Sequence, residues 1–149
     1  MWREETTCWC HPSGSTEYET RFDIENHGRS RLALTLPPTA VARGVVIDGA
    51  TVSSTAEARG GSLPIDLPPD RRFVRLVVRS EIGVATGRGA WRVALSTTGI
   101  DMPVLERAWE VLLPDGVELL SASAGLREVA SRSPGWLERL LPVSVRPRD

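Results

Sequence analysis

The clearest hydrophobic period in the chain lies within Thr16–Leu36. In Tyr18–Ile24, apolar or uncharged side chains alternate with charged ones. This alternation predicts a β-strand with one buried face, because successive side chains of a strand point to opposite sides. Leu32–Leu36 repeats the alternation after the turn-prone segment Asn26–Arg29. The two runs together predict a hairpin closed by a four-residue loop.

The remainder of the chain contains further short alternating runs separated by turn residues. Asp48–Gly49 lies between β-branched residues, and Pro114–Gly116 follows another alternating run, so both predict hairpin turns. The other runs typical of strands are Leu63–Leu67, Arg72–Ser80, Trp91–Leu95 and Leu105–Leu113. About eight to ten short strands at this spacing predict an all-β chain, an antiparallel β-sandwich of immunoglobulin-like or jelly-roll-like type.

One short helix is expected near the C-terminus. Ser133-Pro134 supplies an N-cap residue followed by a proline at the first helical position. The apolar side chains of Trp136–Leu141 are spaced to form one stripe, and Pro142 ends the segment.

Length and charge limit the domain organisation and the partners. A chain of 149 residues is typical of one domain. Residues 1–15 show no alternation and are predicted to form a flexible N-terminal arm, which leaves 16–149 as a single β-sandwich domain. A net charge of −1 argues against nucleic acid as a partner. No segment approaches the roughly 20 apolar residues of a spanning helix, so membrane insertion is not expected.

A metal site is one possible chemistry, because Cys8, Cys10 and His11 place two thiols and an imidazole within four residues. A closed zinc site needs a fourth ligand and a wider cysteine spacing, and the only other histidine is His27 in a predicted turn. An unstructured arm with two neighbouring thiols is the simpler interpretation. A disulfide between the two cysteines is a third alternative, although the ring would be strained.

Acidic residues along the first predicted strand invite comparison with glycosidases. Glu17, Glu19, Asp23 and Glu25 share one face, with a rise of about 6.6 Å for each two-residue step, which overlaps the carboxylate separation of inverting enzymes. Arg21 lies in the middle of the same face, as expected for a solvated strand surface of mixed charge. The pattern therefore favours a structural role for these carboxylates.

Nucleophilic catalysis has little support in the sequence. A hydrolytic serine needs a histidine base, and the two histidines lie in the predicted arm and in a predicted turn. No G-x-S-x-G elbow occurs, and no complete phosphate-binding glycine loop is present. We therefore predict that the protein is not an enzyme and uses no cofactor.

Tryptophans could instead form a carbohydrate-binding platform. Trp91 and Trp109 share their parity with aliphatic residues, which favours a place in the core over sugar stacking. Trp2 and Trp9 lie in the predicted arm, where they could be exposed. A carbohydrate-binding module stays an alternative that depends on an exposed Trp91 or Trp109.

Several short phrases in the chain resemble those of a known kind of module. They are Phe22–Asn26 (FDIEN), Leu36–Pro38, Val46–Gly49, Leu67–Pro69, Leu76–Val78 and Trp109–Pro114 (WEVLLP). The chain is similar to β-sandwich modules of large, multidomain secreted or envelope-associated bacterial proteins of unassigned function. The resemblance implies one module of a longer polypeptide, in the cell envelope or secreted, that serves as spacer or interaction surface.

The sequence thus favours a non-catalytic structural or protein-interaction module of β-sandwich fold. Its expected partners are neighbouring domains of a larger protein or another protein. A homodimer through sheet edges is also possible, since an unpaired edge can add a strand. The alternatives are a carbohydrate-binding module and a small metal-binding protein that uses Cys8, Cys10 and His11.

Overall fold

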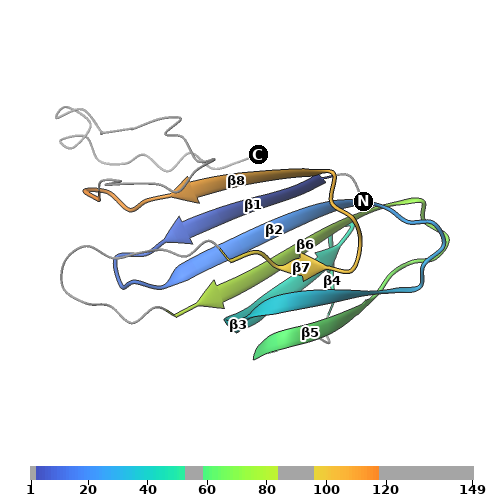
Figure 1. The fold of residues 1–149 in the computed structure, drawn as a ribbon, viewed down its shortest axis with the longest axis horizontal. Helices are drawn as coiled ribbons and strands as arrows, with labels where there is room; N and C mark the ends of the chain where they lie inside the picture. Colours follow the sequence, from blue (N-terminus) through green and yellow to red (C-terminus); the bar gives the residue numbers. More distant parts are fainter. Residues whose placement is uncertain (1–2, 53–58, 84–95, 118–149) are drawn as a thin grey trace. The chain divides into compact units, whose positions relative to one another are not determined.

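The structure is a computed structural model that describes residues 3–52, 59–83 and 96–117. The chain divides into two compact units, Met1–Pro114 and Asp115–Asp149, and all the strands described below lie in the first unit. They are β1 (Arg3–Cys10), β2 (Thr16–Glu25), β3 (Arg31–Ile47), β4 (Ala50–Thr51), β5 (Arg59–Asp66), β6 (Phe73–Ile82), β7 (Gly99–Ile100) and β8 (Glu106–Leu112) (Figure 1).

The predicted all-β class is confirmed for the described residues, in which every regular element is a strand. Within this part of the chain, no helix is long and apolar enough to cross a membrane. The helix expected over 133–141 and the strand expected over 91–95 lie outside the described residues. The single domain predicted over 16–149 stays a prediction for the same reason.

Six strands form a continuous sheet in the order β4-β3-β6-β2-β1-β8. All neighbours are antiparallel except β1 and β8, which run parallel. The expectation of a purely antiparallel arrangement is therefore wrong. A parallel pair needs a long crossover connection, and β1 and β8 lie at opposite ends of the described chain, which allows one.

Strand β2 confirms the alternation that the sequence predicted. Tyr18, Thr20, Phe22 and Ile24 are buried, whereas Glu17 and Arg21 on the opposite face are exposed. The buried face of β2 contributes to one cluster of apolar side chains from β1, β2, β3, β5 and β6. The aliphatic core predicted from the alternating runs is therefore present.

Strand β3 serves two sets of neighbours. Its first half, 31–36, pairs with β5 and β7, and its second half, 40–47, pairs with β6 and β4 and, at Val41 alone, with Arg59 of β5. Pro37-Pro38 separates the halves, where two residues without backbone N–H groups interrupt regular pairing. Gly60 on β5 comes so close to this point that a Cβ there would lie 2.6 Å from the Pro38 carbonyl oxygen.

The predicted hairpin between the first two alternating runs is wrong, because β2 and β3 do not pair with each other. Both flanks of β2 are taken by β1 and β6. Asn26 fixes the loop between β2 and β3. Its amide Nδ2 donates hydrogen bonds to the carbonyl oxygens of Arg29 and Pro68, each at 3.0 Å. The loop is thereby held to the segment after β5, and β3 leaves toward β5.

The second predicted hairpin is confirmed. Asp48 and Gly49 have φ angles of 48° and 87°, as a type I′ turn requires, and they join β3 to β4. The Asp48 carboxylate also accepts a hydrogen bond from the backbone N–H of Arg75 at 2.9 Å, which ties this turn to β6.

The prediction of a loose arm is wrong for Arg3–Cys10, which forms β1 between β2 and β8. Its burial alternates along the whole strand, with Glu4, Thr6, Cys8 and Cys10 facing inward. These four residues do not form a recognisable hydrophobic period in the sequence, because two of them are polar and the other two are cysteines. The arrangement is fixed by pairing with β2, which a single-strand pattern cannot reveal.

Candidate functional site

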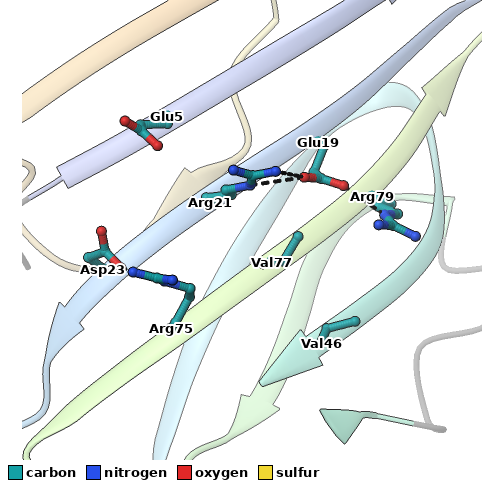
Figure 2. Close-up of a pocket in the computed structure, with 8 residues that line it drawn as sticks. All are labelled: Glu5, Glu19, Arg21, Asp23, Val46, Arg75, Val77 and Arg79. Atoms are coloured by element: carbon teal, nitrogen blue, oxygen red, sulfur yellow. Dashed lines mark hydrogen bonds and ion pairs between the residues drawn. The ribbon is translucent and has the colours of Figure 1, made fainter. Parts of the chain in front are cut away.

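The face of the sheet opposite the core has an open depression of about 380 Å³ (Figure 2). We call it the outer-face depression. It is lined by Glu5 of β1, by Glu19, Arg21 and Asp23 of β2, by Val46 of β3, and by Arg75, Val77 and Arg79 of β6. Three arginines and three carboxylates thus surround two valines.

The register of the sheet places opposite charges side by side in this depression. Glu5 lies opposite Arg21 across β1 and β2, and Asp23 and Glu19 lie opposite Arg75 and Arg79 across β2 and β6. Directly opposite residues of an antiparallel pair share a face and approach closely. Two of these three juxtapositions are ion pairs across strands, Asp23 with Arg75 and Glu19 with Arg79.

Glu19 is the most buried charge in the outer-face depression, with 8% of its surface exposed. Its Oε1 accepts hydrogen bonds from Nε and Nη2 of Arg21 at 2.9 and 2.7 Å, and its Oε2 accepts one from Nε of Arg79 at 2.9 Å. Burial raises the pKa of Glu19, but the hydrogen bonds from the two arginines outweigh burial, and the pKa lies below its ordinary value. The carboxylate is therefore held in its ionised form.

The other carboxylates of the depression are also engaged. Asp23 accepts a hydrogen bond from Nε of Arg75 at 3.0 Å, an interaction that raises the pKa of Arg75, and Glu5 forms an ion pair with Arg3 at 2.8 Å. A general acid or base needs a pKa near the working pH, which for a carboxylic acid means a raised pKa. The charges of this surface are arranged as structural ion pairs.

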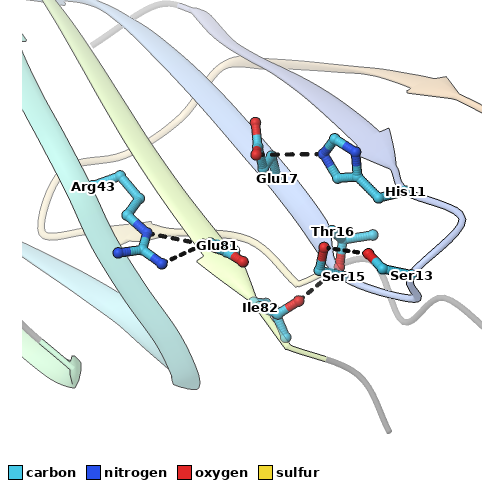
Figure 3. Close-up of polar contacts among 8 residues, drawn as sticks. All are labelled: His11, Ser13, Ser15, Thr16, Glu17, Arg43, Glu81 and Ile82. Carbon is cyan, nitrogen blue, oxygen red and sulfur yellow. Dashed lines mark hydrogen bonds and ion pairs between the residues drawn. The ribbon is translucent and has the colours of Figure 1, made fainter. Parts of the chain in front are cut away.

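A second polar cluster lies around the turn between β1 and β2 (Figure 3). Nε2 of His11 lies 3.4 Å from Oε1 of Glu17. Glu17 lies directly opposite Glu81 on β6, and Glu81 accepts a hydrogen bond from Nε of Arg43 at 2.9 Å. Arg43 therefore offsets the charge of Glu81, and the imidazole of His11 lies beside Glu17.

The three residues of the candidate metal site lie on different surfaces. Cys8 and Cys10 are free thiols on the inward face of β1, whereas the imidazole of His11 is beside Glu17 on the outer face. Burial, followed by the neighbouring Cys10, raises the pKa of Cys8 to about 12. In the described part of the chain, no three His, Cys, Asp or Glu side chains are placed to hold a metal ion together.

An ion pair between the buried Glu4 of β1 and the exposed Arg107 of β8 was not visible in the sequence. Glu4 is only 1% exposed, and its Oε2 accepts a hydrogen bond from Nε of Arg107 at 3.1 Å, while its Oε1 is buried and accepts none from the described residues. Burial raises the pKa of Glu4, and Arg107 partly opposes that rise. No sequence signal distinguishes this glutamate from the exposed ones, because its neighbours on the strand are also polar.

Of the two tryptophans predicted to lie in the core, Trp91 and Trp109, the structure describes only Trp109. Trp109 is half-buried against the core, and its ring stands edge-on to Tyr18, with 6.5 Å between ring centroids and an interplanar angle of 84°. This edge-to-face geometry is typical of packed aromatic pairs. Trp9 is also half-buried, whereas Trp2 and Trp91 lie outside the described residues.

Comparison with known proteins gives no further assignment. No family model matches this chain, and no curated protein or solved structure resembles it at a significant level.

Proposed function

We propose that this chain is a non-catalytic structural or protein-interaction module with a β-sandwich architecture. The fold part of the proposal rests on β3, whose first half pairs with β5 and β7 and whose second half pairs mainly with β6 and β4. Both sets contribute to one buried cluster. A sandwich is the arrangement in which two sets of strands enclose a single core.

The observation that carries the functional part is the internal pairing of charges on the outer face. Glu19, Asp23 and Glu5 each interact with an arginine of the same sheet. A surface of this kind is stable in water without a bound ligand, its carboxylates are engaged by arginines, and the pKa of Glu19 is lowered. These properties suit a spacer or scaffold better than an acid–base catalyst.

We further propose that the module belongs to a longer polypeptide, secreted or associated with a bacterial envelope. The support is the resemblance of its strand and turn phrases to such modules. Its partners would then be neighbouring domains or another protein.

A ligand and activity screen tests the proposal. The purified protein is heated with divalent metals, sugars or nucleotides, since a ligand at 100 times its dissociation constant adds about 2.7 kcal/mol of stability. It is also assayed against generic ester, phosphate and glycoside substrates. We expect no ligand-dependent stabilisation and no turnover. Turnover abolished by Glu19→Gln would overturn the non-catalytic assignment, and stabilisation by zinc that is lost in Cys8→Ser would support a metal-binding protein instead.

A further inference from the structure

Strand β8 combines an edge that no other described strand pairs with and exposed apolar side chains. Among the described strands it pairs only with β1, and it ends the order of the sheet. In the described part of Met1–Pro114, four large apolar side chains are exposed, and three of them, Leu105, Leu112 and Leu113, lie in β8 or directly beside it. Their exposed fractions are 80%, 40% and 36%. Apolar side chains beside an unpaired edge are typical of a strand that adds to another chain.

We propose that β8 pairs with β8 of a second copy of this chain, antiparallel and about a twofold axis, so that the sheets of two molecules become continuous. A twofold axis perpendicular to the sheet keeps each face of one copy next to the same face of the other. Directly opposite residues must then lie on the same face of the sheet. Because residues of one face are two apart in a strand, the register can shift only in steps of two residues.

The charges of β8 select one of these registers. In that register Trp109 lies opposite its own copy, and all seven residues of the strand overlap. The remaining pairs are Glu106 with Leu112, Arg107 with Val111, and Ala108 with Glu110. A shift by one step in one direction places Glu106 opposite Glu110, and a shift in the other direction places Glu110 opposite itself. Like charges directly opposite each other destabilise a strand pair.

The register chosen by charge also pairs two of the three exposed leucines with each other. It places Leu105 of one copy opposite Leu113 of the other, at both ends of the paired segment. These two leucines were not used to choose the register. Charge and apolar exposure therefore point independently to the same pairing of two copies.

This inference rests on the proposed function, since it names one partner of an interaction module, a second copy. Its test is the mass of the purified 149-residue chain, measured by sedimentation equilibrium at about 0.1 mM, where any dimer with a micromolar dissociation constant is mostly associated. We expect twice the 16.3 kDa of one chain. A monomer would overturn the pairing while leaving the non-catalytic assignment unaffected.

Two substitutions at one position test the register. Leu112 lies opposite Trp9 within the molecule and opposite Glu106 across the proposed interface, so a charge at this position meets Glu106 only in the dimer, whereas its neighbour Glu110 is the same in monomer and dimer. Leu112→Glu should weaken the dimer and Leu112→Arg should strengthen it, each by about tenfold for the two symmetric pairs. Circular dichroism shows whether each variant is folded.

Ala50→Glu serves as the control, because Ala50 is exposed on β4 at the other end of the sheet order. It should leave the dissociation constant unchanged. Dissociation by Ala50→Glu but not by Leu112→Glu would overturn the assignment to β8. Equal effects of the two Leu112 variants would overturn the proposed register.

Discussion

Replacing Glu19 with glutamine tests whether the ion pairs of the outer face stabilise the fold. The substitution keeps the shape of the side chain but removes the charge that accepts three hydrogen bonds from Arg21 and Arg79. A hydrogen bond to a charged group contributes roughly 1.5–3 kcal/mol. The two arginine side chains are 56% and 65% exposed, so solvent reduces this contribution. We expect a total loss of about 1–2 kcal/mol in the free energy of unfolding at pH 7.

The effect of this substitution should depend on pH. The pKa of Glu19 is lowered in the folded protein. Its contribution to stability is therefore complete above the pKa of an unfolded glutamate and is lost as the pH falls through the folded pKa. The difference in unfolding free energy between wild type and Glu19→Gln should shrink from pH 7 toward about pH 3.

Urea denaturation followed by tryptophan fluorescence at both pH values measures these differences. Glu17→Gln is the matched control, because Glu17 lies on the same face of the same strand but is exposed and faces Glu81. We expect it to change the unfolding free energy by no more than about 0.5 kcal/mol. If Glu19→Gln behaved like this control at pH 7, or if its effect did not vary with pH, the ion pairs would not stabilise the fold as we argue.

Three further substitutions test the core, the bend of β3 and the buried carboxylate. Phe22→Ala removes a fully buried ring and should lower the unfolding free energy by about 3–5 kcal/mol in urea denaturation; a loss below about 1 kcal/mol would contradict its place in the core. Gly60→Ala should lower the melting temperature more than Gly61→Ala, because both have positive φ but only Gly60 also meets a backbone oxygen at 2.6 Å. The raised pKa of Glu4 means that its favourable contribution is present below the unfolded pKa and is lost as the pH rises through the folded pKa. Between about pH 4 and pH 7 the unfolding free energy of wild type should therefore fall relative to that of Glu4→Gln. If the difference between the two proteins did not change with pH, Glu4 would not be buried as described.

The parts of the fold that the sequence predicted are those in which local chemistry decides the outcome. Aliphatic residues on one parity of Tyr18–Ile24 and Leu32–Leu36 have a buried face whichever strands lie beside them. Asp48–Gly49 adopts its turn because its two residues tolerate positive φ. Strand β1 was missed because its inward positions are not aliphatic, so its burial depends on its neighbours.

The candidate site could be predicted only in part for the same reason. The mixed charge of the β2 face was visible and agrees with the observed ion pairs, but the interpretation as a solvated surface is wrong for Glu19, which is buried. The partners were not visible, because Glu19 and Arg79 are 60 residues apart in the chain. The strand that lies beside β2 depends on the Asn26 loop and on the interruption of β3 at Pro37-Pro38. Neither feature has a periodic signature in the sequence.

The parallel pairing of β1 with β8 has a consequence for the order of folding. Its register joins Arg3 to Glu106, so the pair forms only after a loop of about 100 residues has closed. Contacts of such long range slow the folding of β-rich chains, whereas the β1–β2 hairpin needs only a short turn. We therefore expect β8 to join the sheet late. Until it does, the Glu4 carboxylate lacks its arginine, so the final step of folding is also the step that neutralises a buried charge.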